Sequence, residues 1–277
     1  MPISIHVLSH ADELGPVSED AIAACFAELS EIDRVFSTYR DHSDIRRIAR
    51  GELRLVDADP RVGEVEAACR SAAVQTRGLF SAMWRGWFDP TGYVKGWSVE
   101  TAARRHLAPL LGRDRVAGTG IGPIAVGINA GGDMQLFTVR GTGWRWNVGI
   151  ADPRRPGEII ASLQIENGAV ATSGTAERGS HVIDPRTGEP ARGVVSATVA
   201  ADSLTHADLW ATAAVIGGLD DRSWLPGVGE STGLLIADDG RVTRWLDGVS
   251  IDVVDEDDTW TGLSHGDRQP QQERRSF

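Results

Sequence analysis

Helix-like and strand-like segments follow one another irregularly along this chain, and this order constrains the fold more than any other feature. Helical spacing of apolar residues dominates up to about residue 107. Strand patterns dominate from residue 124, interrupted by one apolar helix at Leu204–Ile216. Because the strict β-α-β alternation of a doubly wound sheet is missing, the sequence predicts an α+β fold with mixed β-sheets and packed helices.

Three helices are expected in the first part of the chain. Ser18, followed by two acidic residues, is typical of a helix N-cap, and this helix is expected to end near Phe36. Asp59 and Pro60 occupy the preferred cap and first-turn positions of a second helix. A third helix is expected to begin near Lys95 and to run toward Leu107.

Turn signals divide the second part of the chain into strands. Strands are expected at residues 124–128, 159–165 and 193–200, and residues 3–8 add one more at the N-terminus. Asn167-Gly168 favours a type I′ hairpin between residues 159–165 and 169–172. Asp239-Gly240 predicts a late hairpin between 234–237 and 242–245. We expect a single domain over residues 1–254 and a disordered, acidic then polar tail over 255–277.

Charge and composition exclude several classes of protein. The net charge of −11 argues against nonspecific nucleic-acid binding, which depends on an excess of basic residues. No apolar run reaches the roughly 20 residues that span a membrane, and the N-terminus lacks the features of a signal peptide, so we expect a cytoplasmic protein without stable membrane insertion.

The two cysteines, Cys25 and Cys69, are expected to be buried, inert thiols.

The chain contains one lysine, Lys95, among 28 basic residues. In a sequence so biased toward arginine, a retained lysine indicates a position that needs a compact ammonium rather than a planar guanidinium. Lys95 lies in the glycine-containing segment FDPTGYVKG, residues 88–96. Three further polar segments interrupt the apolar pattern: NAGGD (129–133), TSGTAERGSHVIDPRTG (172–188) and HADLWAT (206–212).

Asp208 and Thr212 are the sharpest candidates for metal binding. They are four residues apart on an expected helix, so both side chains leave the same face. A carboxylate and a hydroxyl are hard ligands that suit Mg²⁺ bound together with substrate phosphates. The alternative is structural: an Asp that favours the helix dipole and a Thr bonded back to a carbonyl.

An alternative metal site would use histidine and aspartate side chains. His181 and Asp184, together with His206 and Asp208, could form a His/Asp metal site of hydrolytic type, but their spacings match no common zinc signature. The sequence contains no Gly-x-Ser-x-Gly nucleophile elbow, no phosphate-binding loop and no dinucleotide fingerprint of the usual spacing.

Five segments in order resemble the ApbE family of FAD:protein FMN transferases. They are FSTYRDHSDIRRI, DPTGYVKGW, INAGGDM, VATSGTAERGSHVIDPRTG and THADLWATA. The resemblance extends from about Ile3 to Leu246 and implies a T-fold-related architecture. It also implies an enzyme that moves FMN from FAD to a Ser or Thr hydroxyl of an acceptor flavoprotein, with Mg²⁺ bound and AMP released.

The same resemblance assigns site residues. It implies that the carbonyl of Gly92 and the side chains of Asp208 and Thr212 bind Mg²⁺, and that Lys95 and His181 are catalytic. Ser81 stands where the family usually has Asp. The implied FAD contacts are Tyr39, Leu79, Phe80, Ser81, Asp89, Lys95, His181 and Val182.

The expected mechanism is electrostatic. Mg²⁺ and Lys95 would stabilise the charge that develops on the FAD pyrophosphate, and His181 would accept the proton of the attacking hydroxyl. Asp184 would either orient His181 or shape the turn before Pro185. Two alternatives remain open at this stage: a Mg²⁺-dependent FAD pyrophosphatase that yields FMN and AMP, and a protein that binds FAD without turnover.

Overall fold

The computed structural model describes residues 1–9, 15–111, 122–174 and 182–252. The longer helices are α1 (Pro16–Phe36), α2 (Asp44–Ala49), α3 (Pro60–Gln75), α4 (Thr91–Ala102) and α6 (Leu204–Gly217). The strands are β1 (Ile3–Ser9), β2 (Pro123–Ala130), β3 (Asp133–Thr138), β4 (Trp146–Ala151), β5 (Ile159–Ile165), β6 (Gly168–Gly174), β7 (Val194–Ala201), β8 (Thr232–Ala237), β9 (Val242–Leu246) and β10 (Val249–Asp252). Short 3₁₀ or π turns cover Leu55–Asp57, Ala103–Leu107, Ala108–Leu111 and Leu225–Val228.

The strands form two antiparallel sheets. The large sheet has eight strands in the order β1-β2-β3-β6-β7-β8-β9-β10, and β4 pairs with β5 in a separate two-stranded sheet. Helices and strands are thus combined without parallel β-α-β units, and the expected α+β fold with packed helices is confirmed, with both sheets antiparallel.

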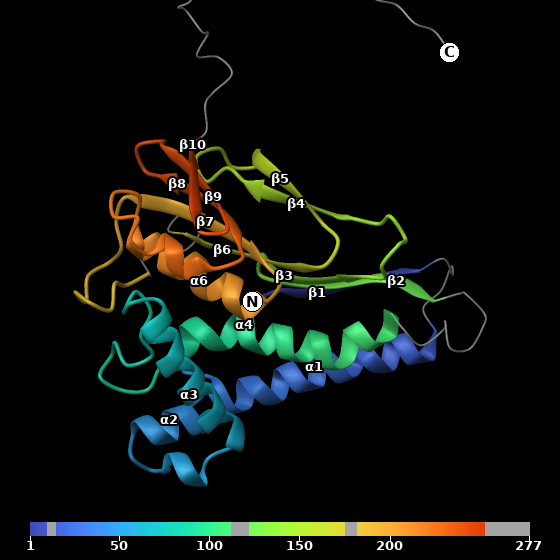
Figure 1. Cartoon of the computed structure of the whole chain (residues 1–277). Coiled ribbons are helices and arrows are strands. Elements are labelled where there is room, and N and C mark those ends of the chain that lie inside the picture. The colour runs from blue at the N-terminus through green and yellow to red at the C-terminus, as the bar shows by residue number, and fades with distance from the viewer. Residues whose placement is uncertain (10–14, 112–121, 175–181, 253–277) are drawn as a thin grey trace, which may run out of the picture.

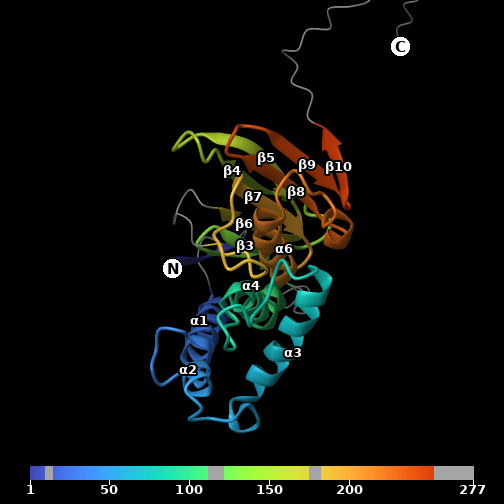
Figure 2. The same cartoon turned by 90° about the vertical axis from the view of Figure 1, so that its left-hand side faces the viewer.

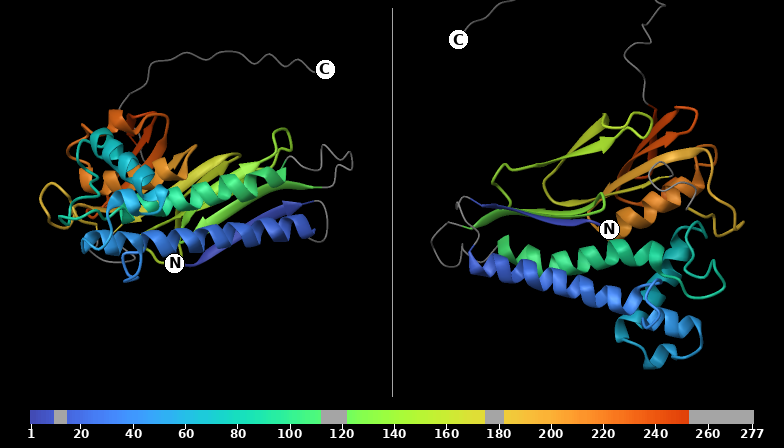
Figure 3. Two further views of the ribbon diagram at one scale, coloured as in Figure 1. Left: turned by 90° about the horizontal axis from the view of Figure 1, so that it is seen from below. Right: turned by 180° about the vertical axis from the view of Figure 1, so that it is seen from behind.

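The molecule is layered, with the large sheet in the middle (Figure 1). Helix α6 lies against one face of this sheet, and α1 and α4 run side by side on the same side of the molecule (Figures 1 and 3). The β4–β5 sheet lies over the opposite face, where Leu136 and Val170 pack against Val148. Alternate residues of β8 lie on opposite faces of the large sheet. Leu234 packs with the β4–β5 layer, whereas Leu235 packs with the helical layer.

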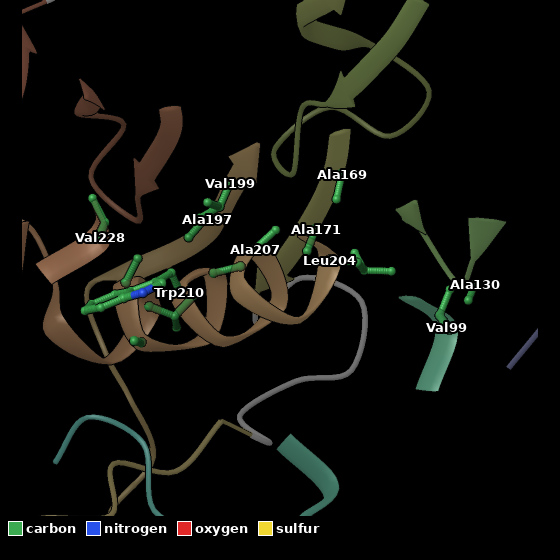
Figure 4. Packing of buried hydrophobic residues seen from close by; sticks show 14 of the residues in the cluster. Val99, Ala130, Ala169, Ala171, Ala197, Val199, Leu204, Ala207, Trp210 and Val228 are labelled. Atoms are coloured by element: carbon green, nitrogen blue, oxygen red, sulfur yellow. The ribbon is translucent and has the colours of Figure 1, made fainter. Parts of the chain in front are cut away.

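Helix α6 is the centre of the main core. Ala207 and Trp210 belong to one buried cluster with the strand residues Ala171, Ala197 and Val199, and the Trp210 ring lies on the side of Val228 (Figure 4). This helix is apolar on most faces because the sheet covers one side and other helices cover the rest, as the sequence predicts. Seen from the side, α3 flanks α4 and α6 (Figure 2) and contributes Val65 and Ala72 to a second cluster.

Two expected helix starts are wrong. Helix α1 begins at Pro16 with Gly15 as the N-cap, and Ser18 already lies inside the helix. Proline at the first position supplies the required φ and needs no donor, so it begins the helix before the serine does. Helix α4 begins at Thr91, because Asp89 accepts a hydrogen bond from the Thr91 N–H at 3.1 Å, and Lys95 therefore lies inside the helix. The expected start at Asp59 and Pro60 is confirmed.

The expected hairpin at Asn167-Gly168 is also wrong. Strand β5 pairs with β4 in the small sheet, whereas β6 pairs with β3 and β7 in the large sheet. The two residues lie where the chain crosses between the layers. Asn167 accepts a hydrogen bond from Thr138 N at 2.8 Å, and a Cβ on Gly168 would lie 2.9 Å from the carbonyl oxygen of Ala201. The late hairpin of β8 and β9 is confirmed, and β10, which the sequence analysis did not predict, extends it.

The two cysteines are buried thiols, as expected from the sequence. Cys25 and Cys69 are buried and not disulfide-bonded, and burial raises the pKa of their thiols to about 11 and about 12. These thiols are therefore poor nucleophiles. In the described part of the chain, no helix is both long and apolar enough to cross a membrane.

Candidate active site

The candidate site is built where α4 crosses α6. A Cβ on Gly96 would lie 2.8 Å from the carbonyl oxygen of Leu204 and 2.9 Å from Cβ of Asp208, so only glycine allows this approach. The Gly96 N–H donates to Oδ2 of Asp208 at 3.0 Å. The crossing thus fixes the carboxylate of Asp208 with one oxygen bound to α4.

Lys95, the neighbour of Gly96, lies between two buried carboxylates. Its Nζ is 2.5 Å from Oδ2 of Asp133 and 3.3 Å from Oδ1 of Asp208. Burial raises the pKa of Asp208 to about 6; the Lys95 ammonium opposes this rise, and the Asp133 carboxylate adds to it. Burial also favours neutral Lys95, but the two carboxylates outweigh it and raise the pKa of that amine. The solitary lysine is therefore a charged group, with a side chain that is 33% exposed and an ammonium held against two buried carboxylates.

Asp133 is a site residue that no sequence pattern identifies on its own. It is the first residue of β3, its side chain is 1% exposed, and its Oδ1 accepts a hydrogen bond from Thr172 N on β6 at 3.2 Å. The segment NAGGD was noted as a polar interruption, but nothing in its spacing linked it to Lys95. Only the pairing of β3 with β6 beside α4 brings the two residues together.

Thr212 follows Asp208 by one helical turn, and both line the same cavity. The Thr212 hydroxyl is hydrogen-bonded to the Ser173 hydroxyl at 2.9 Å. This hydrogen bond to Ser173, near the end of β6, fixes the position of the Thr212 hydroxyl oxygen near the Asp208 carboxylate. A carboxylate and a hydroxyl at this spacing are suitable ligands for a hard divalent cation.

Two cavities meet at Lys95. One of about 440 Å³ contains Asp208 and Thr212, and the other, of about 490 Å³, extends toward α1. Both are lined by Thr38, Tyr39, Thr91 and Lys95. The arrangement provides two adjoining binding spaces with the ammonium of Lys95 at their junction, which has room for an elongated ligand.

Most of the residues implied as FAD contacts line the cavity of about 440 Å³. The exposed Tyr39 is 93% accessible at the junction of the two cavities, and Asp89 is buried, with Arg85 Nη1 3.4 Å from its carboxylate. His181 lies outside the described residues. The implied residues that line this cavity are Tyr39, Leu79, Phe80, Ser81, Asp89, Gly92, Lys95, Val182, Asp208 and Thr212.

The His/Asp metal site is not supported by the described residues. The Nε2 atom of His206 donates a hydrogen bond to the carbonyl of Val228 at 2.8 Å. The His206 side chain lines a separate cavity of about 590 Å³, which Asp208 does not line. Asp184 accepts hydrogen bonds from Arg186 and shapes the turn after Pro185, with its carbonyl accepting from Gly188 N at 2.8 Å. Nowhere in the described ranges do three His, Cys, Asp or Glu side chains gather as a metal cluster.

Glu100 fixes the start of α6 to α4, one turn beyond Gly96. Its Oε2 accepts from Ser203 Oγ at 2.6 Å, from Thr205 N at 2.9 Å and from Thr205 Oγ1 at 2.7 Å. Burial disfavours the ionised form, but these hydrogen bonds outweigh burial and lower the pKa of Glu100. The carboxylate therefore stabilises the folded protein most when it is ionised.

Replacing Glu100 with glutamine is expected to lower the free energy of unfolding by about 1.5–3 kcal/mol at pH 7, because hydrogen bonds to a charged group are lost. Since the folded pKa is below the unfolded one, this difference is fully present above about pH 4.3 and disappears as the pH falls through the lowered folded value. Urea unfolding of both proteins between pH 3 and 7 measures it. Glu64→Gln, at an exposed position on α3, is the control and should change the unfolding free energy by less than about 0.5 kcal/mol. An equal loss at every pH would contradict the role of the Glu100 charge.

The segments that form the candidate site lie in a part of the chain that is similar to known proteins. A model of the ApbE family matches residues 87–226, which include the Lys95 segment, Asp133 and the α6 pair. The FAD:protein FMN transferase of Rhodobacter capsulatus is 38% identical over 125 residues, 42% of this chain and 24% of that protein. The enzyme of the same name from Escherichia coli K12 is 33% identical over 129 residues, 43% of this chain and 35% of that protein. The matched part of this chain thus spans about a quarter to a third of the length of these relatives.

Solved structures show the same fold. The ApbE protein of Thermotoga maritima superimposes with a TM-score of 0.68 at 23% identity, covering 87% of this chain and 93% of that one. The flavinyl transferase ApbE of Pseudomonas stutzeri gives a TM-score of 0.65 at 17% identity, covering 88% and 90%. The family model covers half of the 277 residues, and the residues it covers carry the Lys95–Asp133–Asp208 cluster, so the chain belongs to the ApbE family.

Proposed function

We propose that this protein is a FAD:protein FMN transferase that depends on Mg²⁺ and acts on a Ser or Thr hydroxyl of an acceptor flavoprotein. The observation that carries the proposal is the junction of two cavities at the ammonium of Lys95, which is paired with two buried carboxylates. FAD is a dinucleotide whose two halves are joined by a pyrophosphate. A charge at the junction is where that anionic bridge would be stabilised.

The residues present fit Mg²⁺. Asp208 and Thr212 offer a carboxylate and a hydroxyl in one cavity, and Gly92, whose carbonyl is the third ligand we propose, lines it too. Mg²⁺ typically takes one or two carboxylates and completes its coordination with water and substrate phosphates, so it needs no larger acidic cluster. When bound, the cation would act as a Lewis acid toward the pyrophosphate oxygens.

The chain's own residues supply the rest of the proposed reaction. Lys95 neutralises the negative charge that increases on the pyrophosphate as the acceptor hydroxyl attacks phosphorus on the FMN side. The bond to AMP breaks, and AMP leaves with the bridging oxygen. We assign to His181 the acceptance of the hydroxyl proton, since its reference pKa is near neutral. Tyr39, exposed at the junction, is suited to cover the flavin ring.

The test is incubation of the purified protein with FAD, MgCl₂ and a candidate acceptor flavoprotein. The expected result is covalent flavin on a Ser or Thr of the acceptor, detected by mass spectrometry, with one AMP released for each flavin attached. Free FMN with AMP and no adduct would instead identify a FAD pyrophosphatase. Stoichiometric binding of FAD without AMP would identify a flavin-binding protein. Omission of Mg²⁺ is expected to stop the reaction.

A further inference from the structure

The ammonium of Lys95 is not shared equally by its two carboxylates. It lies 2.5 Å from Asp133 and 3.3 Å from Asp208, and both acids are almost fully buried. One positive charge therefore faces two negative ones, and it is held nearer the acid that is not a proposed metal ligand. Because both carboxylates are buried, the difference between these two distances changes the electrostatic energies of the two acids appreciably.

Asp133 is held by the sheet as well as by Lys95. The Gly131-Gly132 turn, with φ of 63° and 96°, begins β3 directly at this residue. Oδ1 of Asp133 accepts the Thr172 N–H, and Oδ2 is the atom nearest Lys95. The ammonium of Lys95 ends a long, flexible side chain. The short side chain of Asp133 is attached to β3 and hydrogen-bonded to β6. The acid thus determines where the ammonium lies.

An ammonium and a divalent cation compete for the same carboxylate. Oδ2 of Asp208 is bound to Gly96 N, so Oδ1 is its remaining oxygen, and this is the oxygen that Lys95 approaches. We propose that Asp133 is a positioning residue that holds the Lys95 ammonium away from Asp208, so that Asp208 can bind the divalent cation while Lys95 faces the pyrophosphate. This inference rests on the proposed function, because it requires a cation at Asp208.

Asp133→Asn tests the proposal. Asparagine keeps an oxygen for the Thr172 N–H but removes the charge that attracts Lys95, so the ammonium should move onto Asp208. We expect the affinity for Mn²⁺ alone, measured without nucleotide by electron paramagnetic resonance of the free ion, to fall at least about tenfold. The assay contains neither FAD nor acceptor, so the measurement does not depend on activity.

Lys95→Met in the Asp133→Asn background is the decisive comparison. With the competing ammonium removed, Mn²⁺ affinity should return to the wild-type value or exceed it, although transfer stays low. A purely structural role for Asp133 gives no such rescue. Lys95→Met alone should likewise bind Mn²⁺ at least as tightly as the wild type, which keeps the test valid if Asp133→Asn does not fold.

Three outcomes overturn the inference: unchanged Mn²⁺ affinity in folded Asp133→Asn, no recovery in the double variant, or weaker Mn²⁺ binding by Lys95→Met alone. None of these removes the metal site itself. If the wild-type protein binds no Mn²⁺ at all, the inference fails together with the metal site of the proposed function. The two failures are therefore distinguishable.

Discussion

Asp208→Asn is expected to reduce FMN transfer by at least about a thousandfold, because it removes the only carboxylate proposed to bind the cation. Asparagine has nearly the same shape, and its side-chain oxygen can still accept the Gly96 N–H. The fold should persist, since Lys95 keeps Asp133 as its partner. The measurement is the initial rate of covalent flavin attachment to an acceptor at saturating FAD, with circular dichroism as the check on folding.

Asp152→Asn is the matched control for this experiment. Asp152 is also a buried carboxylate paired with a basic side chain, Arg154, but it lies between β4 and β5 and lines neither cavity at Lys95. Its replacement should leave the rate of transfer within about twofold of the wild type, as is usual far from a site. Transfer by folded Asp208→Asn at a rate near that of the Asp152→Asn protein would contradict the proposed metal site.

Local patterns predicted much of the fold. The Asp59-Pro60 start of α3, the apolar α6 and the β8–β9 turn follow from capping, periodicity and turn chemistry, which are properties of neighbouring residues. The Asn167-Gly168 hairpin failed for the opposite reason. Its residues suit a tight turn, but the partners of β5 and β6 lie in different sheets, and strand pairing depends on packing over the whole molecule.

The residues of the candidate site divide in the same way: some are predictable from neighbouring residues, and others depend on packing over the whole molecule. Helical spacing was enough to place Asp208 and Thr212 on one face, and the lysine count singled out Lys95. Asp133 is 38 residues from Lys95 in sequence, and no local rule connects an acid after a glycine pair with a lysine in a helix. The two cavities could not be predicted either, because α1, α4, α6 and the segment around Phe80 together form their walls.

Gly96→Ala is expected to disrupt both stability and transfer, because the added methyl group would meet atoms that have no room to move. Its Cβ would lie 2.8 Å from a backbone oxygen of Leu204 and 2.9 Å from Cβ of Asp208. Separation of α4 from α6 should lower the free energy of unfolding by about 1–3 kcal/mol, the usual cost of overpacking. It would also move Asp208 relative to Lys95, and a displacement near 1 Å can reduce a rate about a hundredfold.

Gly63→Ala separates the effect of this contact from the general effect of replacing a helical glycine. Gly63 lies inside α3, and a Cβ there would meet nothing within 4 Å. Alanine at Gly63 should therefore raise the free energy of unfolding by about 0.5–1 kcal/mol through its higher helix propensity, without affecting transfer. Urea unfolding and transfer rates of both variants measure the contrast. If Gly96→Ala is stabilised as Gly63→Ala is, the close crossing of α4 and α6 does not hold Asp208 in place, and the geometry proposed for the site is wrong.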